Sequence, residues 1–113
     1  METVAKLYLN GKKAGVIYRS GRSTCWNYGL FDPEEGFAEF APLFTCWASL
    51  MHVNKKSDEL DEQTLAELRV AECAIDALET KLFWPASNSW TIASQLNIDG
   101  RLVEWKEGGG AGC

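Results

Sequence analysis

The sequence predicts one α+β domain: an antiparallel sheet of about five strands, in the order β-β-β-α-α-β-β, with two helices packed on one face. Three observations predict this class. The hairpin signal Asn10-Gly11 lies near the start of the chain and Asp99-Gly100 lies near its end. Between them lie two segments whose apolar residues recur at helical spacing. Strands at both ends and helices in the middle are typical of a sheet covered on one side.

The length and composition are typical of a single globular domain. With 113 residues, of which 46% are hydrophobic, the chain can build one hydrophobic core but not two. We expect residues 1–107 to form the domain and the glycine-rich residues 108–113 to form a flexible tail. No apolar run reaches the length of a membrane helix, and the N-terminus has no export signal. We therefore expect a cytoplasmic protein with no membrane partner.

The first three strands are expected at residues 4–9, 14–19 and 24–30. The Asn10-Gly11 turn joins the first two, because both residues suit the positive φ of a tight hairpin turn. This turn places Leu9 opposite Lys12 and Leu7 opposite Ala14, and it directs alternate side chains to the core. The expected core face is Ala5, Leu7, Leu9, Ala14, Val16 and Tyr18, with Ile17 on the other face.

The first helix is expected to begin at Asp32-Pro33-Glu34-Glu35. Asp32 can cap the helix, and proline suits the first turn. Because Pro42 interrupts the helical pattern, we expect either a kink or a second helix that starts near it. The helix that follows should begin near Asp58 or Asp61 and end at Pro85. Its apolar stripe is Leu65, Leu68, Ala71, Cys73, Ile75, Leu78 and Leu82.

The chain closes with the second hairpin. The Asp99-Gly100 turn is expected to have positive φ at both residues and to place Leu96 opposite Val103. The expected inner face is Ile92, Leu96, Ile98, Val103 and Trp105. We expect the two hairpins to join one sheet, because a chain of this length needs one shared core.

The charge is distributed unevenly along the chain. The net charge is −5, yet residues 1–30 carry five basic and one acidic side chains, and residues 31–113 carry six basic and fifteen acidic ones. One interpretation is internal compensation, in which a basic hairpin lies near acidic helices. The other is a bipolar surface that drives self-association or attracts a charged partner. The net negative charge argues against nucleic-acid binding.

The residues that usually carry catalysis or bind metals are sparse. The chain has one histidine, His52, and four cysteines with no Cys-x-x-Cys spacing, so we expect no metal site. We expect free thiols, with Cys46 and Cys73 packed on apolar helix faces. No glycine-rich phosphate loop is present, and neither His52 nor the carboxylates form a pattern typical of catalysis. We therefore identify no catalytic residue and expect no cofactor.

Aromatic residues are the one unusual feature of the composition. There are thirteen, five of them tryptophan. Trp47, Trp84 and Trp105 are expected in the core. The remaining aromatics either fill the core too or form a wall that holds a small ligand or anchors a protein interface. The candidate binding residues are Tyr18, Arg19, Arg22, Trp26, Tyr28 and Trp90.

The first half of the chain resembles a type of small uncharacterised bacterial protein. The resemblance rests on residues 7–11, 15–18 and 26–33, then Phe37, Phe40 and Pro42-Leu43-Phe44, together with the Asp-Gly hairpin at the end. In size and character the chain is similar to proteins carried on mobile integron gene cassettes. Cys25 stands where the pattern has proline. The resemblance implies a bacterial cytoplasmic protein and implies no activity.

Two functions are consistent with these residues. The first is a non-enzymatic interaction protein that binds a protein partner or itself through an aromatic-centred surface. On this hypothesis we expect a homodimer with Trp26 or Tyr28 near its interface. The alternative is a small-molecule binding protein, or a minor enzyme, with an aromatic-lined pocket between sheet and helices. A carboxylate beside the rings of a convergent pocket would favour the alternative.

Overall fold

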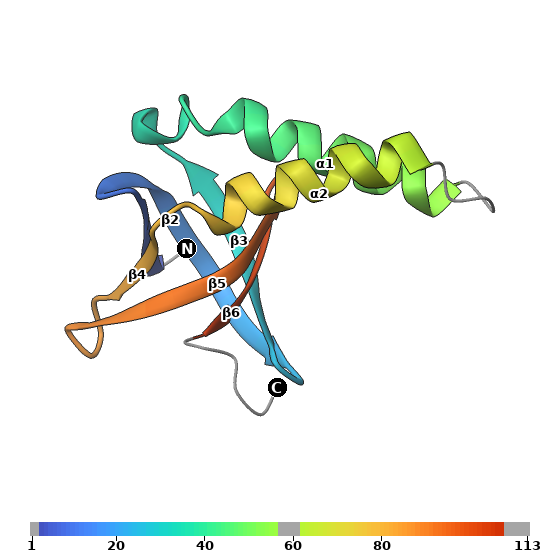
Figure 1. Cartoon of the computed structure of the whole chain (residues 1–113). Helices are drawn as coiled ribbons and strands as arrows, with labels where there is room; N and C mark the ends of the chain where they lie inside the picture. Colours follow the sequence, from blue (N-terminus) through green and yellow to red (C-terminus); the bar gives the residue numbers. More distant parts are fainter. Residues whose placement is uncertain (1–2, 57–61, 108–113) are drawn as a thin grey trace.

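Two helices and a closed antiparallel barrel of six strands make up the part of the chain that the computed structural model describes, residues 3–56 and 62–107 (Figure 1). Going around the barrel, the strand order is β1-β2-β3-β6-β5-β4. The elements are β1 (Thr3–Leu9), β2 (Lys12–Ser23), β3 (Trp26–Pro33), a short 3-10 helix η1 (Glu35–Phe37), α1 (Ala41–Lys56), α2 (Glu62–Asp76), β4 (Thr80–Trp84), β5 (Ser89–Asp99) and β6 (Leu102–Glu107).

The strand that closes the barrel is β4, which the sequence analysis placed at the end of the second helix. Helix α2 ends at Asp76, and β4 then pairs with β1 on one side and with β5 on the other. Leu82 lies opposite Leu7 and Thr91 and is fully buried. The expectation of an open sheet with both helices on one face is therefore wrong. The extra strand pairs both edges of that sheet and leaves a barrel with no free edge.

The first hairpin has the expected turn but a different register. Asn10 and Gly11 have φ of 51° and 80°, and Leu9 pairs with Lys12, as expected. A register shift between Leu7 and Tyr8 then places Leu7 opposite Gly15 rather than Ala14. This bulge directs the Ile17 side chain into the interior, where it is fully buried. The expectation that Ile17 lies on the outer face is therefore wrong.

The second hairpin turns one residue later than expected. Asp99 pairs with Leu102, so the loop is Gly100-Arg101, and Gly100 rather than Asp99 has the positive φ, 60°. Val103 therefore lies opposite Ile98 instead of Leu96, a shift of two residues that leaves the buried face of β6 unchanged.

A bulge inside β5 corrects one more expectation. The strand pairing shifts between Ser94 and Asn97, and Gln95 has a positive φ of 51°. This bulge reverses the alternation of side chains along the strand. Ile92, expected on the inner face, is consequently 63% exposed.

The helical region begins later than the sequence analysis expected. Asp32 and Pro33 belong to β3, and Asp32 pairs with Val16 instead of capping a helix. Helix α1 starts at Ala41, with Pro42 in its first turn, which agrees with the expectation of a helix that starts near this proline. The expected starts of the next helix at Asp58 or Asp61, and the glycine-rich tail, lie outside the described residues.

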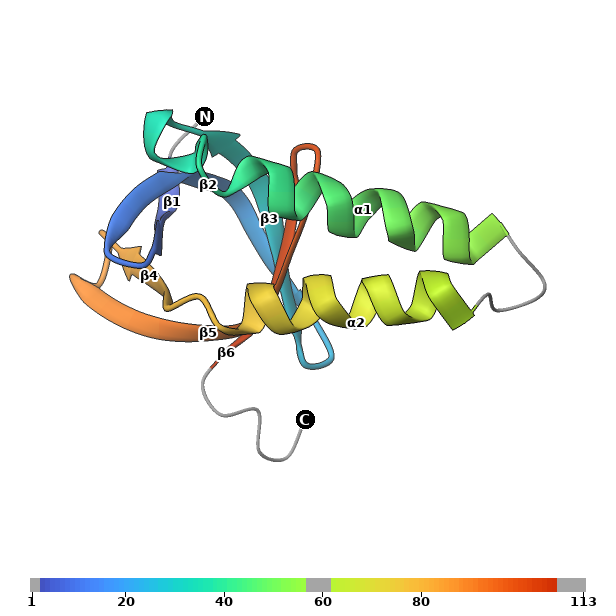
Figure 2. The same ribbon diagram turned by 45° about the horizontal axis from the view of Figure 1, so that its top comes forward.

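Both helices lie side by side across one end of the barrel and add to its core (Figures 1 and 2). The expected stripe of α2 is confirmed at Leu68, Ala71 and Ile75, which are buried. Helix α1 contributes Phe44 and Trp47 to the same cluster as the barrel residues Leu7, Phe31 and Trp105. Trp47 and Trp105 are thus core residues, as expected.

The cysteines differ from their expected environment. Cys46 and Cys73 are free thiols, as expected, but both are exposed instead of buried in the core. Cys25 is disulfide-bonded, which corrects the expectation of a free thiol at this position.

Replacing Gly100 with valine should destabilise the fold by about 1–2 kcal/mol, because a β-branched residue with positive φ is strained. Space is not the reason for the loss, since an added Cβ would meet no atom within 4 Å. The free energy of unfolding in urea measures the effect. Arg101→Val is the matched control, because Arg101 is not among the residues with positive φ. Equal losses for the two variants would contradict the turn geometry.

Leu82→Ala should cost about 2–5 kcal/mol, because it opens a cavity in the barrel interior. Lys81→Ala, at the exposed neighbouring position of the same strand, should cost less than about 0.5 kcal/mol. Urea unfolding of both variants tests whether the side chains of β4 alternate between the barrel interior and the solvent. Similar losses at the two positions would show that residues 80–84 do not form the closing strand.

Candidate functional site

The six candidate binding residues lie on three strands. Tyr18, Arg19 and Arg22 lie on β2, Trp26 and Tyr28 on β3, and Trp90 on β5. Trp26 and Tyr28 share one face near the tip of the β2–β3 hairpin, where Ser23 pairs with Trp26 and Gly21 with Tyr28. Arg22 pairs with Asn27 and therefore lies on the other face. Tyr18 is half-buried further along β2 and pairs with Leu30, while Arg19 is exposed at a bulge.

The aromatic rings near the hairpin tip already have partners. The Tyr28 ring lies against Gly21, where an added Cβ would stand 2.6 Å from its Cζ atom. Lys106 Nζ lies 4.8 Å from the centre of the Trp26 ring. Trp26 also lines a cleft between β5 and the two helices, together with Trp47. The Arg22 Nε donates a hydrogen bond to the carbonyl of Thr24 at 3.2 Å.

Trp90 belongs to a different surface, on the outer side of the barrel. Its ring centre lies 5.0 Å from that of Tyr8 and 5.0 Å from that of Phe83. These three residues come from β5, β1 and β4, which are neighbours in the barrel, and the period of two along each strand turns them outward. Ile92 lies two residues further along β5 on the same face. We call Tyr8, Phe83, Trp90 and Ile92 the aromatic wall.

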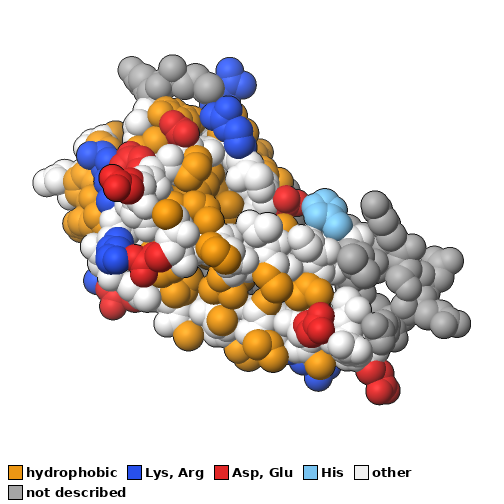
Figure 3. All heavy atoms as spheres, turned by 90° about the horizontal axis from the view of Figure 1, so that it is seen from above, with side chains coloured by type: hydrophobic (Ala, Val, Ile, Leu, Met, Phe, Trp, Pro, Cys, Tyr) orange, Lys and Arg blue, Asp and Glu red, His pale blue; other side chains and the backbone are white. Residues whose placement is uncertain are grey.

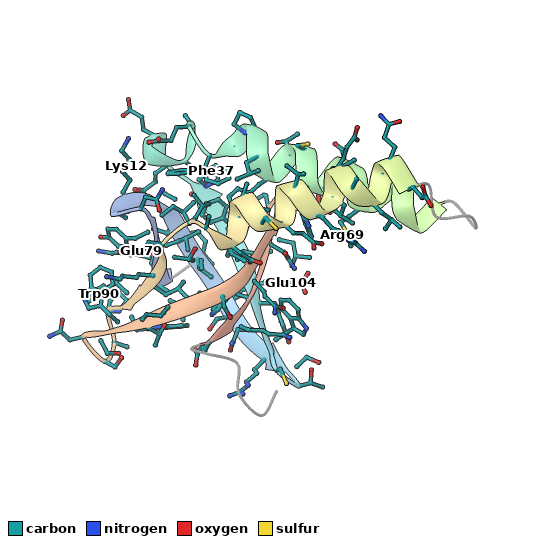
Figure 4. The ribbon with its side chains drawn as sticks, viewed as in Figure 1. Lys12, Phe37, Arg69, Glu79, Trp90 and Glu104 are labelled. Carbon is teal, nitrogen blue, oxygen red and sulfur yellow. The ribbon has the colours of Figure 1, made fainter. Side chains whose placement is uncertain are left out.

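The aromatic wall is exposed and bordered by lysines. Trp90 is 55% exposed, and Figure 4 shows it on the outside of the barrel, on the same side of the molecule as Glu79. Lys6 Nζ lies 6.0 Å from the centre of the Phe83 ring. Lys81 pairs with Glu79 at 3.1 Å. A shallow hollow of about 210 Å³ lies between the rings and this ion pair, lined in part by Tyr8 and Trp90.

Two ion pairs support part of the internal-compensation interpretation. Lys12 pairs with Glu39, and Lys13 pairs with Glu34 at 3.2 Å, so the basic start of β2 lies beside the acidic segment before α1. Lys6 has no carboxylate partner among the described residues. Its charge is therefore available to a partner.

A second exposed apolar surface runs along the helices. Hydrophobic side chains gather between α1 and α2 on the face seen in Figure 3. They line a groove of about 400 Å³ that includes Leu43, Cys46 and Val70, and Val70 is 71% exposed. This groove is built almost entirely from aliphatic and small side chains, without an aromatic ring.

His52 and Asp99 form a contact that no pattern in the sequence indicates. His52 Nε2 lies 2.9 Å from an Asp99 carboxylate oxygen, and both side chains are exposed. The contact joins α1 to the β5–β6 turn. No sequence spacing could have indicated it, because the two residues are 47 positions apart. An exposed pair of this kind contributes at most about 1 kcal/mol to stability.

Within residues 3–56 and 62–107, no cluster of three or more histidine, cysteine or carboxylate side chains is arranged to hold a metal ion. Neither α1 nor α2 has the length and hydropathy that crossing a membrane requires. The chain matches no protein-family model, no curated protein and no solved structure.

Trp90→Ala should cost only about 1–2 kcal/mol, since it removes two ring contacts from an exposed site. Trp105→Ala should cost about 3–5 kcal/mol, because Trp105 is fully buried in the barrel. Urea unfolding of the two variants measures the difference. A loss at Trp90 as large as that at Trp105 would mean that the aromatic wall is part of the core.

Proposed function

We propose that the protein is a non-enzymatic interaction protein and that the aromatic wall binds another protein chain. The observation that carries the proposal is the exposure of Trp90 and Ile92, at 55% and 63%, beside the rings of Tyr8 and Phe83. Contiguous exposed apolar surface of this kind marks interaction sites. Tryptophan and tyrosine are also the residues that most often dominate binding energy at interfaces.

The architecture supports a binding role because it holds the rings in place before a partner arrives. Tyr8, Phe83 and Trp90 lie on three adjacent strands of a closed barrel, and each ring contacts at least one of the others. Aromatic side chains have few rotatable bonds, so little conformational entropy is lost when they are covered.

The charge around the aromatic wall favours a partner that presents carboxylates. Lys6 lies beside Phe83 and pairs with no carboxylate of the part of the chain that the structure describes. A second copy of the chain supplies carboxylates, because residues 31–113 carry fifteen acidic side chains against six basic ones. Closed two-fold dimers are the commonest form of self-association. The proposed partner is therefore a second copy of this chain.

The proposed contact differs from the one expected from the sequence. Tyr28 packs on Gly21 of its own hairpin, and Trp26 has Lys106 over its ring. Trp90 has a larger exposed fraction than Tyr28 and lies in a cluster of rings. We therefore place Trp90, instead of Trp26 or Tyr28, at the centre of the dimer interface.

Sedimentation velocity at low micromolar concentration, with reductant present, tests the proposal. The unmodified chain should sediment as a dimer, and Trp90→Ser should weaken the dimer by about 2 kcal/mol, or roughly 30-fold. Added salt should weaken it further, since part of the attraction is electrostatic.

The matched control is Val70→Ser, which removes an apolar residue that is more exposed than Trp90 and lies in the helix groove. This variant should remain dimeric. A monomeric unmodified chain would overturn the proposal, as would a dimer that Val70→Ser dissociates and Trp90→Ser leaves intact.

A further inference from the structure

A cleft with polar and aromatic walls lies between the two helices and β5. Its volume is about 360 Å³, within the range of roughly 300–1,000 Å³ that is usual for small-molecule sites. Trp26 and Trp47 supply its aromatic side, and Glu72 and Asp76 of α2 supply its acidic side. It shares no residue with the aromatic wall, so it is a separate feature of the molecule.

Trp47 provides a hydrogen-bond donor without a partner. The residue is only 8% exposed, and its indole N–H donates to no described residue. Among the described residues, Trp105 has a side-chain nitrogen that is fully enclosed and has no hydrogen-bond partner. The Nε1 atom of Trp47 also has no partner, but it is not fully enclosed. The unpaired Nε1 of Trp47 therefore reaches the molecular surface, and Trp47 lines the cleft. Nearly buried donors of this kind are normally paired, so this N–H is available to a ligand.

The two carboxylates of the cleft are also unpaired. Glu72 and Asp76 are one helical turn apart and therefore share a face of α2. Neither forms a hydrogen bond or an ion pair with any described residue. Two like charges at this spacing repel one another, and a cation held between them would remove the repulsion.

The opposite side of the cleft is formed by the bulge in β5. Gln95, with its positive φ of 51°, and Asn97 interrupt the pairing with β6 and line the cleft. A non-glycine residue in this conformation is strained, and bulges near binding sites commonly redirect a side chain. The bulge places two amide side chains across from the carboxylates of α2.

A second hollow of about 300 Å³ continues the cleft along α2 and β5. It shares Ile75, Asp76, Gln95 and Leu96 with the first and adds Thr80 and Ser94, whose hydroxyl groups donate hydrogen bonds to backbone carbonyls. The two hollows meet at Asp76 and Gln95, so together they extend along α2 and β5, with Asp76 shared by both. An unbranched chain fits this shape better than a compact ring system.

We infer that the cleft binds a small organic cation, a primary ammonium group carried on a short unbranched chain. Glu72 and Asp76 would accept hydrogen bonds from the ammonium, and the aromatic side would cover its alkyl chain. Lys106 already lies over the Trp26 ring, so the carboxylates rather than this ring select for positive charge. Trp47 Nε1 and the amides would bind polar groups further along the ligand.

The probe for the test is n-butylammonium, with n-butanol and butyrate as neutral and anionic compounds of similar shape. The titration follows the five tryptophan indole N–H signals by NMR at constant ionic strength, with signals assigned by Trp→Phe variants. Butylammonium should shift the signals of Trp26 and Trp47 in a saturable manner and leave that of Trp90 unchanged. Butanol and butyrate should bind at least tenfold more weakly.

The double variant Glu72→Gln/Asp76→Asn should weaken butylammonium binding at least tenfold. Glu62→Gln/Glu67→Gln is the matched control, since it makes the same change in net charge on α2 outside the cleft. It should leave the affinity unchanged.

Equal binding of the three compounds, equal loss in the two double variants, or no saturable shift at Trp26 and Trp47 would overturn the inference. Because no residue of the aromatic wall is changed in these variants, the outcomes do not depend on whether the chain dimerises through Trp90.

Discussion

The pairing of β4 on both of its edges is the constraint on which the rest of the structure depends. This strand of five residues hydrogen-bonds to β1 on one side and to β5 on the other. Without it the barrel would open and leave the edges of β1 and β5 unpaired. Leu82 would also lose its place in the interior, where it is fully buried. A closed barrel thus depends on a segment that is shorter than any other strand of the described residues.

The same strand fixes both candidate sites. Its outward residue Phe83 joins Tyr8 of β1 to Trp90 of β5, so the aromatic wall exists only because β4 lies between those strands. The chain passes from α2 to β4 through three residues, 77–79, so closure of the barrel also holds the end of α2 beside β5. That position puts Asp76 across the cleft from Gln95. One closure therefore positions both the aromatic wall and the cleft.

Local signals in the sequence predicted the elements better than their assembly. The Asn10-Gly11 turn and the buried stripe of α2 were predictable, because each depends on neighbouring residues alone. The end of α2 was not predictable, because Leu78 and Leu82 continue the helical spacing of apolar residues. Residues 80–84 also fit the alternation of side chains that is typical of a strand. The helical spacing therefore predicts a helix at Phe83, and the sequence alone does not bring the residues of the aromatic wall together. Bulges leave no comparable signal, so the inward turn of Ile17 and the exposure of Ile92 also required the structure.

Nuclear Overhauser effects between backbone protons test the closure of the barrel most directly. We expect cross-strand contacts that connect Leu82 with Leu7 on one side and with Thr91 on the other, because β4 pairs with both neighbours in this register. Strong sequential amide–amide contacts through residues 80–84, with no contact from Leu82 to Leu7, would show instead that α2 continues through this segment and that the sheet is open.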